Sequence, residues 1–179
     1  KSYTESEIKE FLDKNNILEP FEKPDERDYY PMPPTAKAFA DCCNEFWWVC
    51  PYVAKGLWRD EILYAKYYLD HFVRDQLMKM INWYVGQKSQ FSLSPGKFGK
   101  HLQQYLEPEF WEMLQKTYSD AGYENTWEAL FTTCFLFRKL AIQVAALFGF
   151  DYIHKDDERV SAHLQHVRCL PKNAKVIYR

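Results

Sequence analysis

Apolar residues recur along most of this chain at spacings of three and four, and the alternating pattern of a β-strand is almost absent. Thr35 is placed to act as an N-cap for the first clear stretch, residues 36–50. The apolar face of that stretch is formed by Phe39, Cys42 or Cys43, Phe46 and Val49. The pattern predicts an all-α fold, an up-and-down helical bundle of about five to six helices.

The longest periodic stretch predicts a helix from about Leu57 to Val85, with Gly86 as its C-terminal cap. Two i, i+4 pairs on this helix, Asp70–Arg74 and Asp75–Lys79, are most simply part of a solvated face. At roughly 1.5 Å per residue the helix is about 40 Å long, which suits one wall of a bundle. Its expected buried stripe consists of Ile62, Leu69, Phe72, Val73, Met80 and Tyr84.

Pro51 and Gly56 predict a bend between these two helices. Proline removes a backbone donor and disfavours helical geometry in the residue before it, so the first helix is expected to end near Cys50. Glycine tolerates the dihedral angles of a change in direction. Tyr52 and Lys55 would then lie in a short loop over a cleft between the helices.

The remaining segments are shorter. Thr4–Asn15 predicts a helix, and the prolines of Leu18–Pro34 predict an extended connector. Two short helices are expected at Phe98–Leu106 and Pro108–Tyr118, and a helix is expected near Asp157–Arg168. The apolar stretch Trp127–Phe148 predicts a central helix, opened by a capping box at Asn125 and Glu128 and ended by Gly149.

Composition narrows the classes of protein. The chain has 179 residues, 47% of them hydrophobic, and a net charge of −2, which favours one globular domain and argues against a nucleic-acid partner. Its five cysteines form no C-x-x-C pair, and there is no secretory leader at Lys1, so a reducing, cytoplasmic compartment is expected. Arg138, Lys139 and Gln143 interrupt the apolar run Ala129–Phe150, which favours a core helix over a membrane span.

The densest candidate chemistry lies at Cys42–Ala65, which concentrates aromatic rings and both signs of charge. Asp41, Glu45 and Trp48 stand at i, i+4 and i+7 and therefore share one stripe of a helix. Two interpretations stay open: a ligand site, or a tight helical corner whose aromatic residues are simply core.

Two further patterns, a glycine–lysine loop and a histidine pair, are weaker indications of a binding site and also have ordinary structural explanations. The loop SPGKFGK, Ser94–Lys100, can present amides and ammonium groups to an anion, but many such loops are plain turns. His163 and His166 have the i, i+3 spacing of metal ligands, but only Cys169 lies near enough to add a third, so no metal site is expected.

The chain also resembles the aminoglycoside (streptomycin) 6-adenylyltransferase family. The resemblance rests on NEFWWVCPYVAKGLWRDEILYA at residues 44–65, on Trp83–Gly86, on Ser94–Lys97 and on YENTWEALF at Tyr123–Phe131, and it extends from about Tyr29 to about Phe150. Members of that family transfer AMP from ATP to the 6-hydroxyl of streptomycin. An N-terminal domain binds Mg–ATP, and a C-terminal helical bundle closes the antibiotic site.

The resemblance implies that residues 1–34 are the tail of the catalytic domain and a linker, and that residues 35–179 are the helical substrate-binding bundle. The superfamily binds Mg²⁺ through a Gly-Ser turn followed by Asp-x-Asp, and this sequence contains neither. We therefore expect no catalytic residue and no metal ligand in this chain. ATP and Mg²⁺ would be held mainly by the N-terminal domain, with an aminoglycoside as the second substrate and no membrane partner.

Streptomycin carries two guanidinium groups, so its pocket should offer sheltered carboxylates and aromatic faces. The expected drug-contacting residues are Glu45, Trp48, Tyr52, Asp60 and Glu61. The resemblance implies that Lys97 contacts the ATP triphosphate from this side, and the expected nucleotide-contacting residues are Lys55, Arg59, Lys97, Lys100 and Tyr123. The alternative is a non-enzymatic helical module that binds a partner or a small cationic ligand.

Overall fold

The computed structural model describes residues 30–178, and the regular structure in that range is entirely helical. The all-α prediction is therefore confirmed. The predicted helix Thr4–Asn15 and most of the connector Leu18–Pro34 lie outside the described residues. The elements are α2 (Ala36–Trp58), α3 (Ile62–Tyr67), the π-helical segment η2 (Tyr68–Val73), α4 (Arg74–Lys88), the 3₁₀ turns η3 (Lys97–Gly99) and η4 (Leu102–Gln104), α5 (Pro108–Lys116), α6 (Tyr123–Phe148) and α7 (His154–Cys169).

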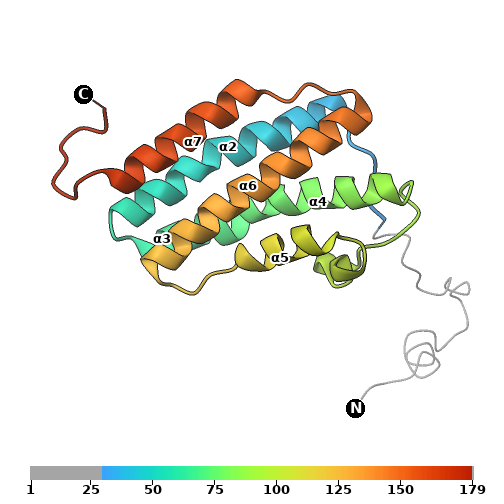
Figure 1. Ribbon diagram of the computed structural model, residues 1–179, viewed down its shortest axis with the longest axis horizontal. Coiled ribbons are helices and arrows are strands. Elements are labelled where there is room, and N and C mark those ends of the chain that lie inside the picture. The colour runs from blue at the N-terminus through green and yellow to red at the C-terminus, as the bar shows by residue number, and fades with distance from the viewer. Residues whose placement is uncertain (1–29, 179) are drawn as a thin grey trace, which may run out of the picture.

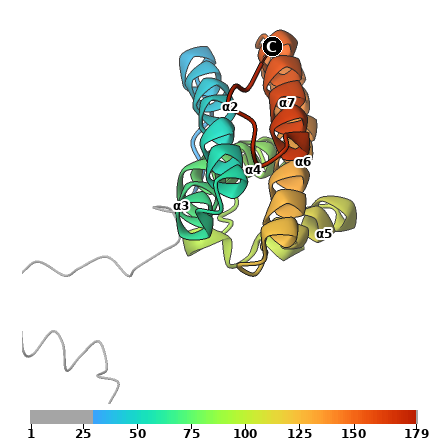
Figure 2. The same cartoon turned by 90° about the vertical axis from the view of Figure 1, so that its left-hand side faces the viewer.

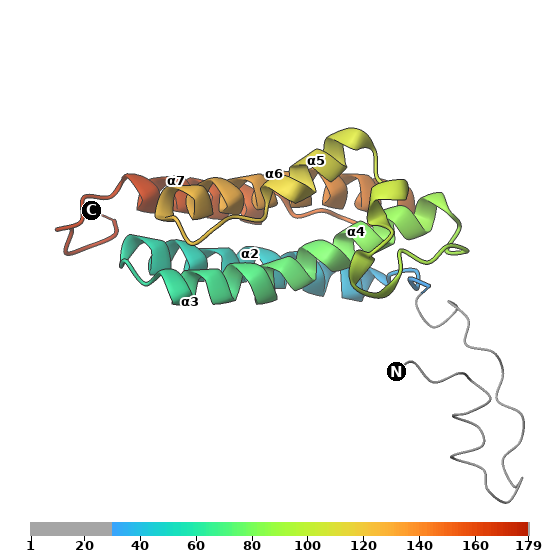
Figure 3. The ribbon, with the colours of Figure 1, turned by 90° about the horizontal axis from the view of Figure 1, so that it is seen from below.

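The helices form two layers. Figure 1 looks through both layers, and Figure 2 shows α2, α3 and α4 on one side of the bundle and α5, α6 and α7 on the other. Figure 3, seen from below, shows the same division and places the C-terminal segment at the end where α2 and α7 finish. The loop that follows α4 lies at the opposite end of the bundle.

Helix α2 does not end at Cys50, so the predicted change of direction at Pro51 and Gly56 is wrong. The helix continues through Pro51 to Trp58. A proline inside a helix costs about 3 kcal/mol, but buried apolar side chains lie on both sides of it, and each contributes roughly 1.5–3 kcal/mol. The reversal comes later, at Arg59–Glu61, where Asp60 adopts a left-handed conformation with φ 61°.

Gly56 serves close packing instead of a bend. A Cβ atom there would lie 2.8 Å from Cδ1 of Tyr64 and 3.1 Å from both the Cβ and the backbone nitrogen of Ala65. The missing side chain thus lets the end of α2 lie directly against α3.

The predicted long helix exists as α3, η2 and α4 in succession, from Ile62 to Lys88. Gly86 is not its cap: the helix runs on to Lys88, with Ser89 as the C-cap. Two side chains also differ from expectation. Phe72, expected in the buried stripe, is 40% exposed, and Arg74, expected on the solvated face, is buried and donates hydrogen bonds to the hydroxyl and carbonyl of Thr117.

In the second layer, α5 confirms the helix predicted from Pro108, but Phe98–Leu106 is not a helix and contains only the two 3₁₀ turns. Helix α6 starts at Tyr123, so the predicted capping box is wrong. The amide of Asn125 instead donates to Asp120, which also accepts from the backbone of Gly122. Gly149 ends α6 in the left-handed conformation, as predicted.

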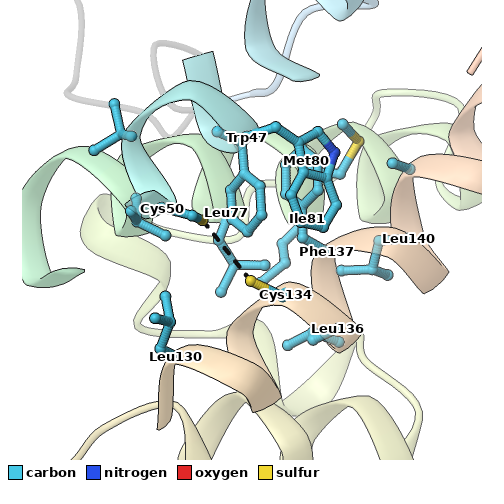
Figure 4. Close-up of a cluster of buried hydrophobic side chains, with 14 of the residues drawn as sticks. Trp47, Cys50, Leu77, Met80, Ile81, Leu130, Cys134, Leu136, Phe137 and Leu140 are labelled. Carbon is cyan, nitrogen blue, oxygen red and sulfur yellow. Dashed lines mark hydrogen bonds between the residues drawn. The ribbon is translucent and has the colours of Figure 1, made fainter. Parts of the chain in front are cut away.

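Helix α6 is the central helix of the bundle. Of the helices in the described range, it is the one whose length and apolar composition would suffice to cross a membrane, and half of its most apolar window is buried inside the bundle. Its Phe137 ring stacks on Phe46 of α2, with 3.7 Å between centroids. Figure 4 shows this core, including the thiols of Cys50 and Cys134, whose sulfur atoms lie 3.8 Å apart. The vicinal Cys42 and Cys43 are likewise buried as packing residues.

Candidate functional site

Three hollows lie along α2, and each holds some of the residues singled out from the sequence. The polar hollow lies between α2 and α4 and measures about 580 Å³. The aromatic hollow lies between α2 and the start of α7 and measures about 520 Å³. The strap hollow, about 450 Å³, lies where α2 and α7 end and is closed on one side by the C-terminal residues 170–178.

The polar hollow combines carboxylates with an indole ring. Asp41 and Glu45 of α2 face Gln76, Lys79 and Trp83 of α4 across it. Asp41 forms an ion pair with Lys37, and the ammonium of Lys79 donates to the Gln76 side chain at 3.1 Å. Glu45 forms no ion pair with any residue that the structure describes. Its half-buried carboxylate is therefore available to a cation.

The loop of Lys97 packs on the same helix, α4. A Cβ atom on Gly99 would lie 3.1 Å from Cε of Met78, so the loop packs against α4 within one turn of Lys79. Gly96, Phe98 and Gly99 all have positive φ angles, and Ser94 is buried and accepts a hydrogen bond from the Gly96 amide. The side chain of Lys97 remains exposed.

The aromatic hollow is lined by rings and by residues that no sequence signal identified. Trp48 and Tyr52 come from α2, whereas Asp151, Tyr152 and Asp156 come from the loop after α6 and the first turn of α7. Trp48 is 64% exposed, so its ring is open to a ligand. Helical periodicity cannot reveal such a convergence, because it depends on how α7 packs on α2.

An ion pair with a buried carboxylate packs against the wall of this hollow. Asp157 accepts hydrogen bonds from Arg138 of α6 on both carboxylate oxygens and from the hydroxyls of Tyr152 and Ser161. Burial by itself would raise the pKa of Asp157, but these hydrogen bonds and the charge of Arg138 hold it below the ordinary value. Burial, together with the hydrogen bond to Asp157, raises the pKa of Tyr152.

The strap hollow is bordered by cations. Lys55 and Arg59 of α2, His163 of α7 and Lys175 of the C-terminal segment line it, together with the rings of Tyr52 and Trp58. The ammonium of Lys55 lies 5.1 Å from the centroid of Tyr52 and 5.3 Å from that of Tyr64.

The structure does not bring the predicted drug-contacting residues into one hollow. Glu45 lies in the polar hollow, whereas Trp48 and Tyr52 lie in the aromatic hollow. Asp60 and Glu61 line none of the three, and the Asp60 carboxylate pairs with Lys172 at 2.7 Å. The idea of a single shared cleft is therefore wrong, and the binding role of each residue stays a prediction.

The predicted nucleotide-contacting residues are also separated. Lys97 and Lys100 follow α4, at the end of the bundle opposite to Lys55 and Arg59 (Figure 1). Lys55 and Arg59 line the strap hollow, and neither Lys97 nor Lys100 does, so the structure does not gather the four cations around one hollow. Tyr123 donates a hydrogen bond from its hydroxyl to the carbonyl of Asp60 at 2.7 Å, which fixes the α2–α3 turn.

Comparisons with known proteins identify relatives of most of this chain. The model of a family described as streptomycin adenylyltransferase matches residues 1–167. An aminoglycoside 6-adenylyltransferase of Bacillus subtilis is 40% identical over 92% of this chain and 58% of its own length, and that of Campylobacter jejuni is 39% identical over 88% and 54%. The chain spans little more than half the length of these relatives.

A solved structure shares the fold. The crystal structure of an aminoglycoside 6-adenyltransferase from Bacillus subtilis superposes with a TM-score of 0.72 and 37% identity, over 91% of this chain and 64% of that one.

Proposed function

Because the chain belongs to the streptomycin adenylyltransferase family, we propose that it is the C-terminal, substrate-binding part of an aminoglycoside O-adenylyltransferase. The protein as a whole would transfer AMP from ATP to a hydroxyl of streptomycin and thereby confer antibiotic resistance. The observation that carries this proposal is the 37–40% identity to three aminoglycoside 6-adenylyltransferases over 81–92% of the chain.

Metal-dependent catalysis would be supplied by the N-terminal domain. Within residues 30–178, no group of three or more His, Cys, Asp and Glu side chains could hold a metal ion. Bound Mg²⁺ would neutralise the phosphates of ATP during the displacement. The part described here would bind and orient the antibiotic and contact the triphosphate.

The polar hollow suits the antibiotic better than the other two. It offers the unpaired carboxylate of Glu45 and the face of Trp83, and a guanidinium group binds to both kinds of group. AMP transfer also requires the drug hydroxyl to lie next to the α-phosphate. The Lys97 loop packs on α4, the helix that forms one wall of the polar hollow, which supports placing the drug there.

The other predicted drug contacts stay proposals, and the structure supports some of them more than others. Glu61 is exposed and forms no ion pair within the described range, so it is free to bind a cation on a drug or on the catalytic domain. The carboxylate of Asp60 is already neutralised by Lys172 and is a weaker candidate. Trp48 and Tyr52 would contact a drug only if it extended into the aromatic hollow.

The first experiment asks whether the activity exists. The complete protein encoded by the parent gene should be incubated with α-labelled ATP and a panel of aminoglycosides that includes streptomycin. We expect release of pyrophosphate and transfer of the label to streptomycin. If the folded complete protein labelled no aminoglycoside, the proposed function would be rejected in favour of a non-enzymatic binding module.

The second experiment separates the drug site from the nucleotide site in that complete protein. Glu45→Gln should weaken streptomycin binding about tenfold, since a charge-assisted hydrogen bond contributes roughly 1.5–3 kcal/mol, and should leave ATP binding unchanged. Lys97→Ala should raise the KM for ATP and spare the drug. Glu112→Gln and Lys116→Ala, both on exposed positions of α5, are matched controls for the loss of each charge. Equal effects of Glu45→Gln and Glu112→Gln on the drug would exclude the polar hollow.

A further inference from the structure

The strap hollow is distinct from the polar hollow and the Lys97 loop, to which the drug and the triphosphate were assigned above, although it shares Tyr52 with the aromatic hollow. It is at the opposite end of the bundle from the Lys97 loop (Figure 1). The residues that close it, 170–178, follow the last residue matched by the family model, which is 167. It therefore has to be explained by its own chemistry.

The C-terminal segment is fastened at both of its ends. Near its start, the indole Nε1 of Trp58 donates to the carbonyl of Leu170 at 3.2 Å, and Lys172 donates to the carbonyl of Trp58 at 2.6 Å and to Asp60 at 2.7 Å. These contacts tie the segment to the end of α2.

Two histidines of α7 hold the other end. Nε2 of His166 donates to the carbonyl of Ile177 at 2.5 Å, and the His166 ring stacks on Tyr178 with 4.9 Å between centroids. Nδ1 of His163 lies 2.5 Å from the Tyr178 hydroxyl. The fastened segment places Lys175 against the hollow opposite Lys55 and Arg59.

The charge of this hollow is positive and uncompensated. No carboxylate is among its lining residues, and Lys55, Arg59 and Lys175 form no ion pair with any residue that the structure describes. Asp60, which follows the lining residue Arg59, is paired with Lys172. Burial and the neighbouring His166 lower the pKa of His163, so its imidazole adds no charge at neutral pH.

Cationic side chains alone would bind any anion, but the walls of this hollow also include aromatic rings, which favour a ligand with a flat ring. Tyr52 and Trp58 are both half-buried and both line the hollow. Aromatic faces stack on flat rings such as nucleobases, and clustered lysine and arginine side chains bind phosphate. A volume of about 450 Å³ lies within the range typical of small-molecule sites.

We propose that the strap hollow is a second ligand site, separate from the site of AMP transfer, which binds an aromatic phosphate of mononucleotide size. Lys55, Arg59 and Lys175 would bind the phosphate, and Tyr52 and Trp58 would contact the ring. The C-terminal segment would be a wall of this site, because it contributes Lys175.

The test uses the 179-residue chain and AMP as the probe, and it reads binding from the indole N–H signal of Trp58 in a ¹⁵N correlation spectrum. That signal reports the site directly, since Trp58 Nε1 bonds to Leu170, and Trp58→Phe would assign it. We expect AMP to shift the signal with saturation, and adenosine and inorganic tripolyphosphate to bind more weakly. Tripolyphosphate binding as tightly as AMP would overturn the role of the aromatic walls.

Three variants make the test specific. Lys175→Ala should weaken AMP about fivefold, the equivalent of roughly 1 kcal/mol for an accessible ion pair, and Tyr178→Ala should also weaken it by releasing the segment. Lys116→Ala removes another exposed lysine, on α5, and should have no effect. Equal affinities of Lys175→Ala and Lys116→Ala for AMP, or an unshifted Trp58 signal in the unaltered chain, would overturn the proposal.

Lys97→Ala separates this site from the transfer site. It should leave the AMP-dependent shift of Trp58 intact, and loss of the shift in this variant would contradict a separate site. The result is independent of the transfer assay on the complete protein, so either proposal can fail while the other stands.

Discussion

Arg138 and Asp157 join the two longest helices of the second layer through a two-pronged ion pair whose carboxylate is 3% exposed. Nε of Arg138 donates to Oδ2 of Asp157 at 2.5 Å, and one terminal nitrogen donates to Oδ1. The hydroxyls of Tyr152 and Ser161 complete the shell of donors. Because Tyr152 also lines the aromatic hollow, this pair fixes the position of that wall as well as of α7.

Removing the carboxylate should destabilise the protein strongly. Asp157→Ala would leave Arg138 and Tyr152 without their shared acceptor, and losing these charge-assisted hydrogen bonds should cost roughly 1.5–3 kcal/mol, since the Arg138 side chain is 31% exposed and can reach solvent. Urea unfolding followed by circular dichroism would measure the loss. Lys139→Ala is the control, because its pair with the exposed Glu109 should contribute no more than about 1 kcal/mol. Similar losses in the two variants would show that the buried pair is not a main support of α7.

The same pair predicts how stability depends on pH. The native pKa of Asp157 lies below its ordinary value, so the unfolded chain binds this proton more readily than the folded one. The stabilisation is therefore complete above the unfolded pKa, about 4, and is lost as the pH falls through the native pKa. Unfolding midpoints of the unaltered chain and of Asp157→Asn should differ at pH 7 and converge toward pH 3. A constant difference over that range would contradict the assignment.

The sequence predicted the helices well because burial follows helical spacing. Phe39, Phe46 and Val49 are all buried, as the spacing of α2 required, and Gly149 ends α6 where glycine was expected. The sequence-based prediction failed at Pro51 because the preference of proline against helix interiors was outweighed by the packing of the whole helix.

The candidate site was less predictable. Asp41 and Glu45 share the polar hollow, in agreement with their shared stripe on the helix. Trp48 belongs to the same stripe and yet lines the neighbouring hollow, since α7 supplies partners on that side. The contributions of Asp156 and Lys175 come from contacts between distant segments, which no local pattern encodes.

The close packing of Gly56 against α3 predicts that a larger residue at this position will destabilise the protein. In Gly56→Ala the new methyl group would meet the Tyr64 ring at 2.8 Å and the backbone nitrogen of Ala65 at 3.1 Å. Overpacking costs roughly 1–3 kcal/mol, which should exceed the gain of about 1 kcal/mol in helix propensity. Gly122→Ala is the control, because Gly122 has φ −71° and is exposed, and the nearest atom to its Cβ position, at 2.9 Å, is the side-chain Oδ1 of Asp120 and not backbone. A Gly56→Ala protein more stable than the control would mean that α2 and α3 separate easily.

The reaction rates of the cysteine thiols should show how well the core excludes a reagent. Cys42, Cys43, Cys50 and Cys134 are buried, whereas Cys169 is exposed at the end of α7. Burial raises the pKa of Cys42 to about 12, and it also raises the pKa of Cys43 and Cys50. Since the thiolate is the reactive form, these groups should be slow to react with a disulfide reagent such as DTNB. One fast-reacting thiol is expected in the native protein and five in urea.

Cys169→Ser should abolish the fast phase, whereas Cys134→Ser should leave it unchanged. The sulfur atoms of Cys50 and Cys134 lie 3.8 Å apart between α2 and α6, so rapid reaction of a second thiol in the native state would show that these two helices separate transiently. Such a result would contradict the closed core seen in Figure 4, whereas a single fast thiol would indicate that the two layers stay packed on the timescale of the assay.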